Sequence, residues 1–132
     1  MKNYKVITLD NLAKATAQQV FNHIVNHLII QGVPSRNDLT CKNRLVTEDG
    51  TILKCAAGCL ITSEQYEALE SKEGRWSFMQ EKNKGITSRN FGLISRLQVE
   101  HDRLRRIDEK FHAAMFNDIA EKYGLKPFPT QS

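Results

Sequence analysis

The stretch Cys41–Thr62, CKNRLVTEDGTILKCAAGCLIT, decides the fold class of this chain. Asp49-Gly50 separates two β-compatible segments, 41–46 and 51–55, and glycine reaches the positive φ that a tight hairpin turn needs. The second segment runs into Ala56-Ala57-Gly58, three small residues that allow another part of the molecule to approach the backbone closely. We expect a helix to pack there, although a ligand could also fill the space.

An amphipathic helix is predicted ahead of the hairpin. Thr16 and Gln19 have the spacing of a capping box, in which each side chain satisfies a backbone N–H of the first turn. Gly32 suits the left-handed end of a helix, and Pro34 prevents its continuation. Between them lies one apolar stripe, formed by Val20, Phe21, Ile24, Val25, Leu28 and Ile29.

Further helices are predicted after the hairpin. Thr62 and Gln65 repeat the capping-box spacing, so we expect a helix over about 63–72. From Ser88 to Gly124, apolar residues recur at helical spacing. One helix of that length would be unusual in so small a domain, and we therefore expect a break near 103–110.

The composition indicates one globular domain. Of the 132 residues, 40% are hydrophobic and 26% are charged. We predict a single α+β domain over 1–132, with an N-terminal arm at 1–15 and an extended tail at 126–132. An N-terminal helix would precede a small antiparallel hairpin or sheet, and two to three further helices would pack on it. The chain has no apolar run of membrane-spanning length and no apolar signal segment, so we expect a cytoplasmic protein without a membrane partner.

Three cysteines, Cys41, Cys55 and Cys59, lie in the central stretch. In a reducing compartment we expect thiols rather than disulfides. With His101 or His27 as a fourth ligand they could hold zinc, but their spacing lacks the paired C-x2-C units that zinc sites favour. Cys59 precedes a predicted helix start and is a candidate nucleophile, because a helix N-terminus lowers the pKa of a thiol. We favour the simpler interpretation of small buried side chains, with no bound metal and no cofactor.

Two histidine patterns are candidates for chemistry. His23 and His27 are four residues apart and share a helix face, a spacing that can hold a metal, but no carboxylate partner accompanies them. His101-Asp102 resembles the signature of HD-type metal-dependent phosphohydrolases, which need further, separated ligands. Adjacent side chains on a helix point to different faces. We therefore expect helix-flank histidines in the first case and a buried, hydrogen-bonded His101 in the second.

Basic residues around the hairpin suggest an anion site. The formal net charge of +4 permits an anionic partner without requiring one. Arg36, Arg44 and Lys54 flank a backbone of small residues that includes Gly58, and we predict that these residues, with His101, bind a phosphate or carboxylate.

A second basic set lies on the C-terminal helical segment and suggests nucleic acid as an alternative ligand. It comprises Arg89, Arg96, Arg103, Arg105 and Arg106. Acidic residues are interleaved with these arginines, which is typical of a mixed, solvated helix face.

The layout resembles a group of small accessory proteins of bacteriophages and prophages. Their pattern is a helix ending in L-x-x-Q-G, a Cys-x-Tyr-Arg element, a hairpin, a Lys-Cys-Ala-x-Gly element followed by Leu-Ile, and a Leu-Gln-x-x-His-Asp helix. The matching segments here are 28–32, 41–44, 54–61 and 97–102. Asn43 stands where the pattern has tyrosine, so a stacking role for that tyrosine is missing. The resemblance implies a phage-encoded protein of the host cytoplasm and no specific activity.

These observations favour a non-enzymatic protein that counters host defence. It would sequester a nucleotide-type signal or occupy a host protein. The alternatives are a nucleic-acid-binding module that uses the arginine-bearing C-terminal helix and, with less support, a metal-dependent hydrolase that uses His101 and Asp102. Exposed hairpin edges and the long apolar stripe also favour a homo-oligomer.

Overall fold

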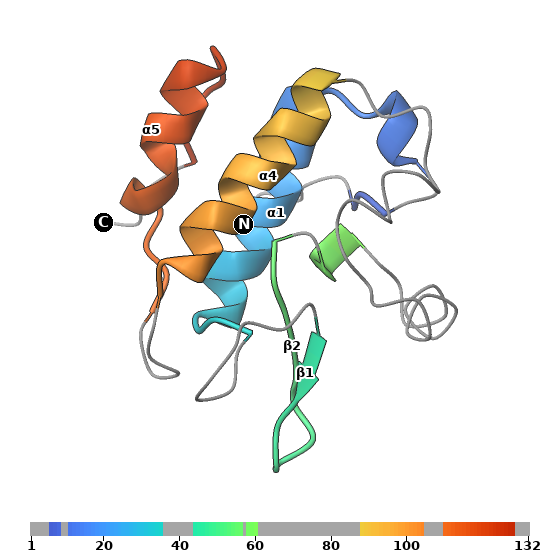
Figure 1. Cartoon of the computed structure of the whole chain (residues 1–132), viewed down its shortest axis with the longest axis vertical. Helices are drawn as coiled ribbons and strands as arrows, with labels where there is room; N and C mark the ends of the chain where they lie inside the picture. The colour runs from blue at the N-terminus through green and yellow to red at the C-terminus, as the bar shows by residue number, and fades with distance from the viewer. Residues whose placement is uncertain are drawn as a thin grey trace.

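The structure, a computed structural model, describes residues 6–8, 11–35, 44–56, 58–60, 88–104 and 110–128. This part of the chain forms a small, helix-rich α+β domain (Figure 1). Helix α4 packs against both α1 and α5. In chain order the elements are η1 (Leu12–Lys14), α1 (Ala17–Gln31), β1 (Arg44–Val46), β2 (Ile52–Lys54), η2 (Gly58–Leu60), α4 (Ser88–Asp102) and α5 (Ala114–Lys122).

Helix α1 begins and ends as the sequence predicts. The Thr16 side chain accepts from the Gln19 N–H, and the Gln19 side chain accepts from the Thr16 N–H, which completes the capping box. Gly32 ends the helix at φ 84°, and its N–H donates to the Leu28 carbonyl at 2.8 Å. The predicted stripe is buried from Val20 to Leu28 and forms one wall of the core.

The capping box gives a first testable prediction. Replacing Thr16 by alanine removes the oxygen that accepts from Gln19, so the free energy of unfolding should fall by about 1 kcal/mol. Thr16→Ser keeps that oxygen and should retain the wild-type value. Urea unfolding monitored by circular dichroism distinguishes the two variants, and equal midpoints would contradict this account of the helix start.

The two strands pair antiparallel, with Leu45 opposite Leu53 and Val46 opposite Ile52. Strand β2 has three residues, fewer than the segment 51–55 led us to expect, while residues 41–43 of the first predicted segment lie outside the described residues. Gly50 lies in the turn at φ 86°. Figure 1 shows the hairpin extending away from the helices.

Among the described residues, α1, α4 and α5 pack mainly on one another rather than on the hairpin, which differs from the expected packing of the helices on the strands. The physical reason is the small apolar surface of two three-residue strands. On β2, the side chain of Leu53 is buried while that of Ile52 is exposed. In the described part of the chain, the hairpin is therefore attached to a core formed mainly by helices.

The predicted break in the C-terminal helical pattern is confirmed, since α4 ends at Asp102 and α5 begins at Ala114. No proline or glycine lies in the sequence between the two helices, and tertiary contacts accompany the break. The Phe111 N–H donates to the Gly32 carbonyl at 2.8 Å, and the Phe111 ring stacks on His101 with centroids 5.5 Å apart. The helix predicted over 63–72 lies outside the described residues.

The small residues after β2 pack against a helix, as expected. Ala56 and Gly58 are buried, and η2 contacts α1. In the part of the chain that the structure describes, no helix combines the length and apolarity needed to cross a bilayer.

Candidate docking groove

A groove of about 490 Å³ lies between α1 and β2, which places it within the size range of ligand sites. We call it the α1–β2 groove. It is lined by Val6, His23, Asn26, His27, Ile30, Gln31, Thr51, Ile52 and Leu53. None of these lining residues carries a carboxylate, an ammonium or a guanidinium group.

The rim of the α1–β2 groove is apolar and exposed. Val6 is 66% exposed, Ile30 is 74% exposed and Ile52 is 45% exposed. Only two other large hydrophobic side chains of the described residues are exposed, Val46 and Val99, and Val46 pairs with Ile52 across the hairpin. Exposed apolar side chains gathered around one concave site indicate a binding surface, whereas single ones do not.

Gln31 attaches the hairpin to the end of α1. Its Oε1 accepts from the Lys54 N–H at 2.8 Å, and its Nε2 donates to the Lys54 carbonyl at 3.0 Å. The same Nε2 donates to the Val33 carbonyl at 2.8 Å. One side-chain amide thus makes the pair of hydrogen bonds with Lys54 that a neighbouring strand would make. These bonds hold β2 next to α1 at this end of the groove.

His23 connects three segments at the other end of the groove. Its Nδ1 accepts from the Ile7 N–H at 3.3 Å, so the ring proton resides on Nε2. Nε2 lies 3.2 Å from the Cys59 carbonyl and donates to it. This neutral tautomer satisfies both contacts, which positions the segment 6–8 and η2 against α1.

His27 lies in the groove one turn along α1. Its Nε2 is buried and has no hydrogen-bond partner in the described structure. The pKa of His27 is lowered from 6.5 to about 4, mainly by burial and in smaller part by the neighbouring His23 and Lys54. The nearby Lys54 carbonyl and Gln31 side chain oppose this shift only in part. His27 is therefore neutral at pH 7, and the groove holds no cationic imidazole.

None of the predicted anion-binding residues that the structure describes lines the α1–β2 groove. Lys54 is half-buried beside it, and the Lys54 backbone is bonded to Gln31. Gly58 is buried, and its N–H donates to Cys55 Sγ at 3.2 Å. Arg36 and the side chain of Arg44 lie outside what the structure describes. An anion-binding role for these residues stays a prediction.

His101, the fifth predicted binding residue, is fully buried and hydrogen-bonded, which confirms the structural alternative for this position. Its Nε2 accepts from the Ser35 N–H at 3.0 Å, so Nδ1 carries the proton and donates to the Asp102 carboxylate at 2.8 Å. The expectation that these adjacent side chains point to different faces was wrong. The helix ends at Asp102, where its carboxylate can turn back toward the neighbouring ring.

The described cysteines are buried thiols, as the simpler interpretation expects. Burial raises the pKa of the Cys59 thiol well above its usual value, which opposes a role as a nucleophile, and the predicted helix start after Cys59 lies outside the described residues. Cys59 Sγ donates to the Ala56 carbonyl at 3.1 Å. Cys41 lies outside the described residues, and among those that are described no three histidine, cysteine or acidic side chains are grouped as metal ligands.

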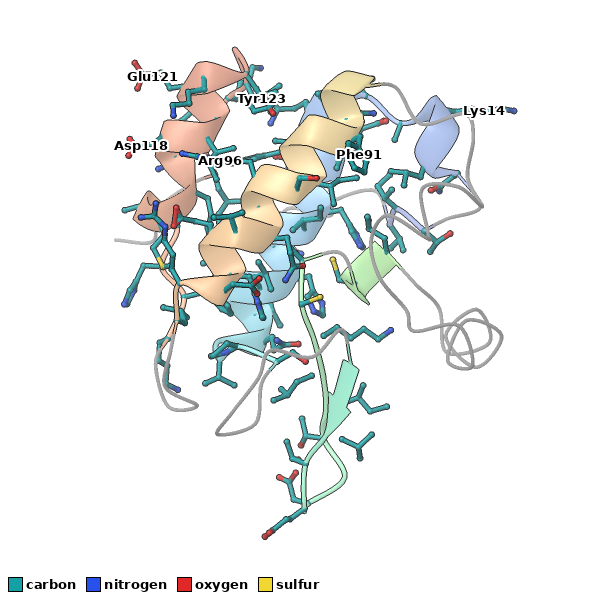
Figure 2. All side chains as sticks on the ribbon, in the orientation of Figure 1. Lys14, Phe91, Arg96, Asp118, Glu121 and Tyr123 are labelled. Carbon is teal, nitrogen blue, oxygen red and sulfur yellow. The ribbon has the colours of Figure 1, made fainter. Side chains whose placement is uncertain are left out.

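A second groove, of about 560 Å³, lies between α4 and α5. Three cationic and three acidic side chains line it, together with Ile119: Arg96, Arg103 and Lys122, and Glu100, Asp118 and Glu121. Figure 2 shows Arg96 reaching from α4 toward α5, with Asp118 and Glu121 projecting from α5. Arg103 Nε is 3.5 Å from a Glu100 oxygen. For Arg96 and Arg103 this balance of charges supports the interpretation of a mixed, solvated face, while Arg105, Arg106 and the side chain of Arg89 lie outside the described residues.

No family model, curated protein or solved structure matches the chain. The resemblance to phage accessory proteins therefore stays a prediction. Sequence reasoning missed most of the groove residues, although one signal was available. Ile30 is a large apolar residue that lies off the buried stripe of α1, where a solvated helix face would carry a polar side chain.

Proposed function

We propose that this is a non-enzymatic binding protein whose α1–β2 groove docks an uncharged, largely apolar segment of a protein partner. In the phage setting that the resemblance implies, the partner is a host protein of the bacterial cytoplasm, and docking would interfere with its role in defence. The supporting observation is the combination of an exposed apolar rim with described lining residues that carry no charged group.

The lining favours a protein segment over a nucleotide. Phosphate groups are bound in proteins by arginine, lysine or backbone N–H groups at a helix N-terminus. The described lining residues of the groove include no arginine and no lysine, and both of its histidines have a lowered pKa. An apolar segment buries the rim instead, at about 25 cal/mol for each Å² of apolar surface removed from water.

The nucleic-acid alternative has weaker support. A DNA or RNA backbone lying along α4 would meet Glu100, and the acidic side chains of α5 line the same groove. A nucleic-acid-binding surface usually carries clustered lysine and arginine side chains without acidic residues among them. Steep salt dependence of binding would favour this alternative over the docking of an apolar segment.

Ile30 and Val99 provide a matched test of the proposed function. Both are exposed large hydrophobic side chains on helices, but only Ile30 lines the α1–β2 groove. Ile30→Glu places a carboxylate on the rim of the groove, and docking of an apolar segment would remove that carboxylate from water. We therefore expect the amount of co-purified partner protein to fall at least about tenfold. Val99→Glu should retain it. The measurement is quantitative mass spectrometry of proteins that co-purify with each tagged variant from bacterial cells.

Equal partner recovery with both variants would contradict the proposed function. Native mass spectrometry of the wild-type protein gives an independent check. A stoichiometric adduct of a nucleotide-sized molecule would favour the signal-sequestration hypothesis, and the subunit number would test the predicted homo-oligomer.

A further inference from the structure

The segment Val6–Thr8 forms one wall of the α1–β2 groove and is attached to α1 through His23. Val6 lines the groove, the Ile7 side chain is fully buried, and the Ile7 N–H donates to His23 Nδ1. Asn11 holds the local shape of the segment, since its Nδ2 donates to the Val6 carbonyl and its Oδ1 accepts from the Thr8 N–H. Attachment to the helix and local shape therefore depend on different side chains.

The contacts of His23 are compatible with one protonation state only. In the neutral tautomer Nδ1 offers a lone pair to Ile7 while Nε2 donates to the Cys59 carbonyl. A second proton would enter at Nδ1, directly against the Ile7 N–H. Two donors would then face each other at a separation of 3.3 Å, and the hydrogen bond would be lost.

The surroundings of His23 also disfavour its charged form. Burial lowers its pKa, and Lys54 from β2 lowers it further, while the Cys59 carbonyl raises it in part. His27 is a titratable neighbour on the same helix, and the positive charge of Lys54 lowers its pKa as well. From η2 the neighbouring thiol of Cys59 is buried with a raised pKa and carries no charge. The segment Val6–Thr8 has no titratable side chain.

We propose that His23 is a proton-sensitive latch for the α1–β2 groove. Neutral His23 holds the segment Val6–Thr8 on α1, and protonation of His23 releases that segment together with the Val6 wall. The latch is independent of what the groove binds, whereas its effect on partner binding rests on the proposed function.

The test is amide hydrogen exchange by NMR between pH 7 and pH 5, expressed as protection factors. Opening of the latch takes up one proton, so the protection of the Ile7 N–H should fall by up to about tenfold per pH unit below the ordinary histidine pKa. The Gly32 N–H, bonded within α1, should lose less protection than the Ile7 N–H, because it reports only the global acid destabilisation that His27 causes. In His23→Gln the amide can accept from Ile7 and donate to Cys59 without titrating, so the protection of Ile7 should fall with pH no more than that of Gly32.

Three results would overturn the latch. These are pH-independent protection of Ile7 in the wild type, a parallel loss at Ile7 and Gly32, and an unchanged pH dependence in His23→Gln. If His23→Gln does not fold, the imidazole nitrogen shifts of the wild type decide. The latch requires an unprotonated Nδ1 at pH 7 and a His23 titration that shares its midpoint with the loss of protection at Ile7.

Discussion

Gln31→Met should lower the free energy of unfolding by about 2–4 kcal/mol, although methionine matches glutamine in length and helix propensity. The substitution removes three hydrogen bonds, two to the Lys54 backbone and one to the Val33 carbonyl. These backbone groups are partly buried, and a buried group left without a partner costs about 1–3 kcal/mol, so each lost bond should contribute toward the lower end of that range. The hairpin should also loosen from α1, which disrupts the groove before the core unfolds.

Gln18 offers a matched control at the opposite end of α1. Its amide also bonds the backbone of one residue, since Oε1 accepts from the Lys126 N–H at 2.8 Å and Nε2 donates to the Lys126 carbonyl at 3.2 Å. Nε2 donates as well to the Asn22 side chain on the same helix, at 3.0 Å. These bonds to Lys126 are exposed, so water can replace them, and Gln18→Met should cost about 1 kcal/mol or less. Denaturant unfolding measures both variants. A smaller loss for Gln31→Met than for Gln18→Met would show that Gln31 does not hold the hairpin.

His27→Leu should remove much of the acid sensitivity of the protein. The folded state holds His27 at a pKa of about 4, against 6.5 in the unfolded chain. Between these values the unfolded state binds more protons, so stability is complete above about pH 6.5 and falls as the pH decreases toward 4. The full loss amounts to about 3 kcal/mol. Leucine does not titrate, and it also eliminates the buried Nε2 that has no partner in the described structure.

Thermal or urea unfolding at several pH values from 7 to 4 measures this effect. Asn26→Leu is the control, because it places the same side chain at a neighbouring lining position and leaves His27 in place. The pH dependence of Asn26→Leu should match that of the wild type, and the pH dependence of His27→Leu should be flatter. Identical slopes in all three proteins would contradict a buried, neutral His27.

The start and end of α1 could be predicted from sequence because local residues determine them. Thr16, Gln19 and Gly32 act through their own helix, so their spacing is sufficient evidence. The break after α4 could be predicted from length alone, but its contacts could not. The Phe111 N–H meets the Gly32 carbonyl only after the chain has folded back on itself.

The groove could not be predicted because its polar contacts join residues that are distant in the chain. Gln31 and Lys54 are separated by 23 positions, and no local pattern distinguishes Gln31 from an ordinary solvated glutamine. His101 shows the opposite case. Its place on an apolar stripe predicted burial correctly, yet its bond to Asp102 depends on where α4 ends.

Photo-crosslinking in bacterial cells tests the docking groove most directly. A benzophenone side chain is placed at position 30 or 52, on the rim of the groove, or at position 99, an exposed apolar site outside it. The account predicts the same discrete protein adduct from positions 30 and 52, its loss when Gln31→Met is added, and no such adduct from position 99. An adduct from position 99 with none from positions 30 and 52 would contradict the assignment of the α1–β2 groove as the docking site.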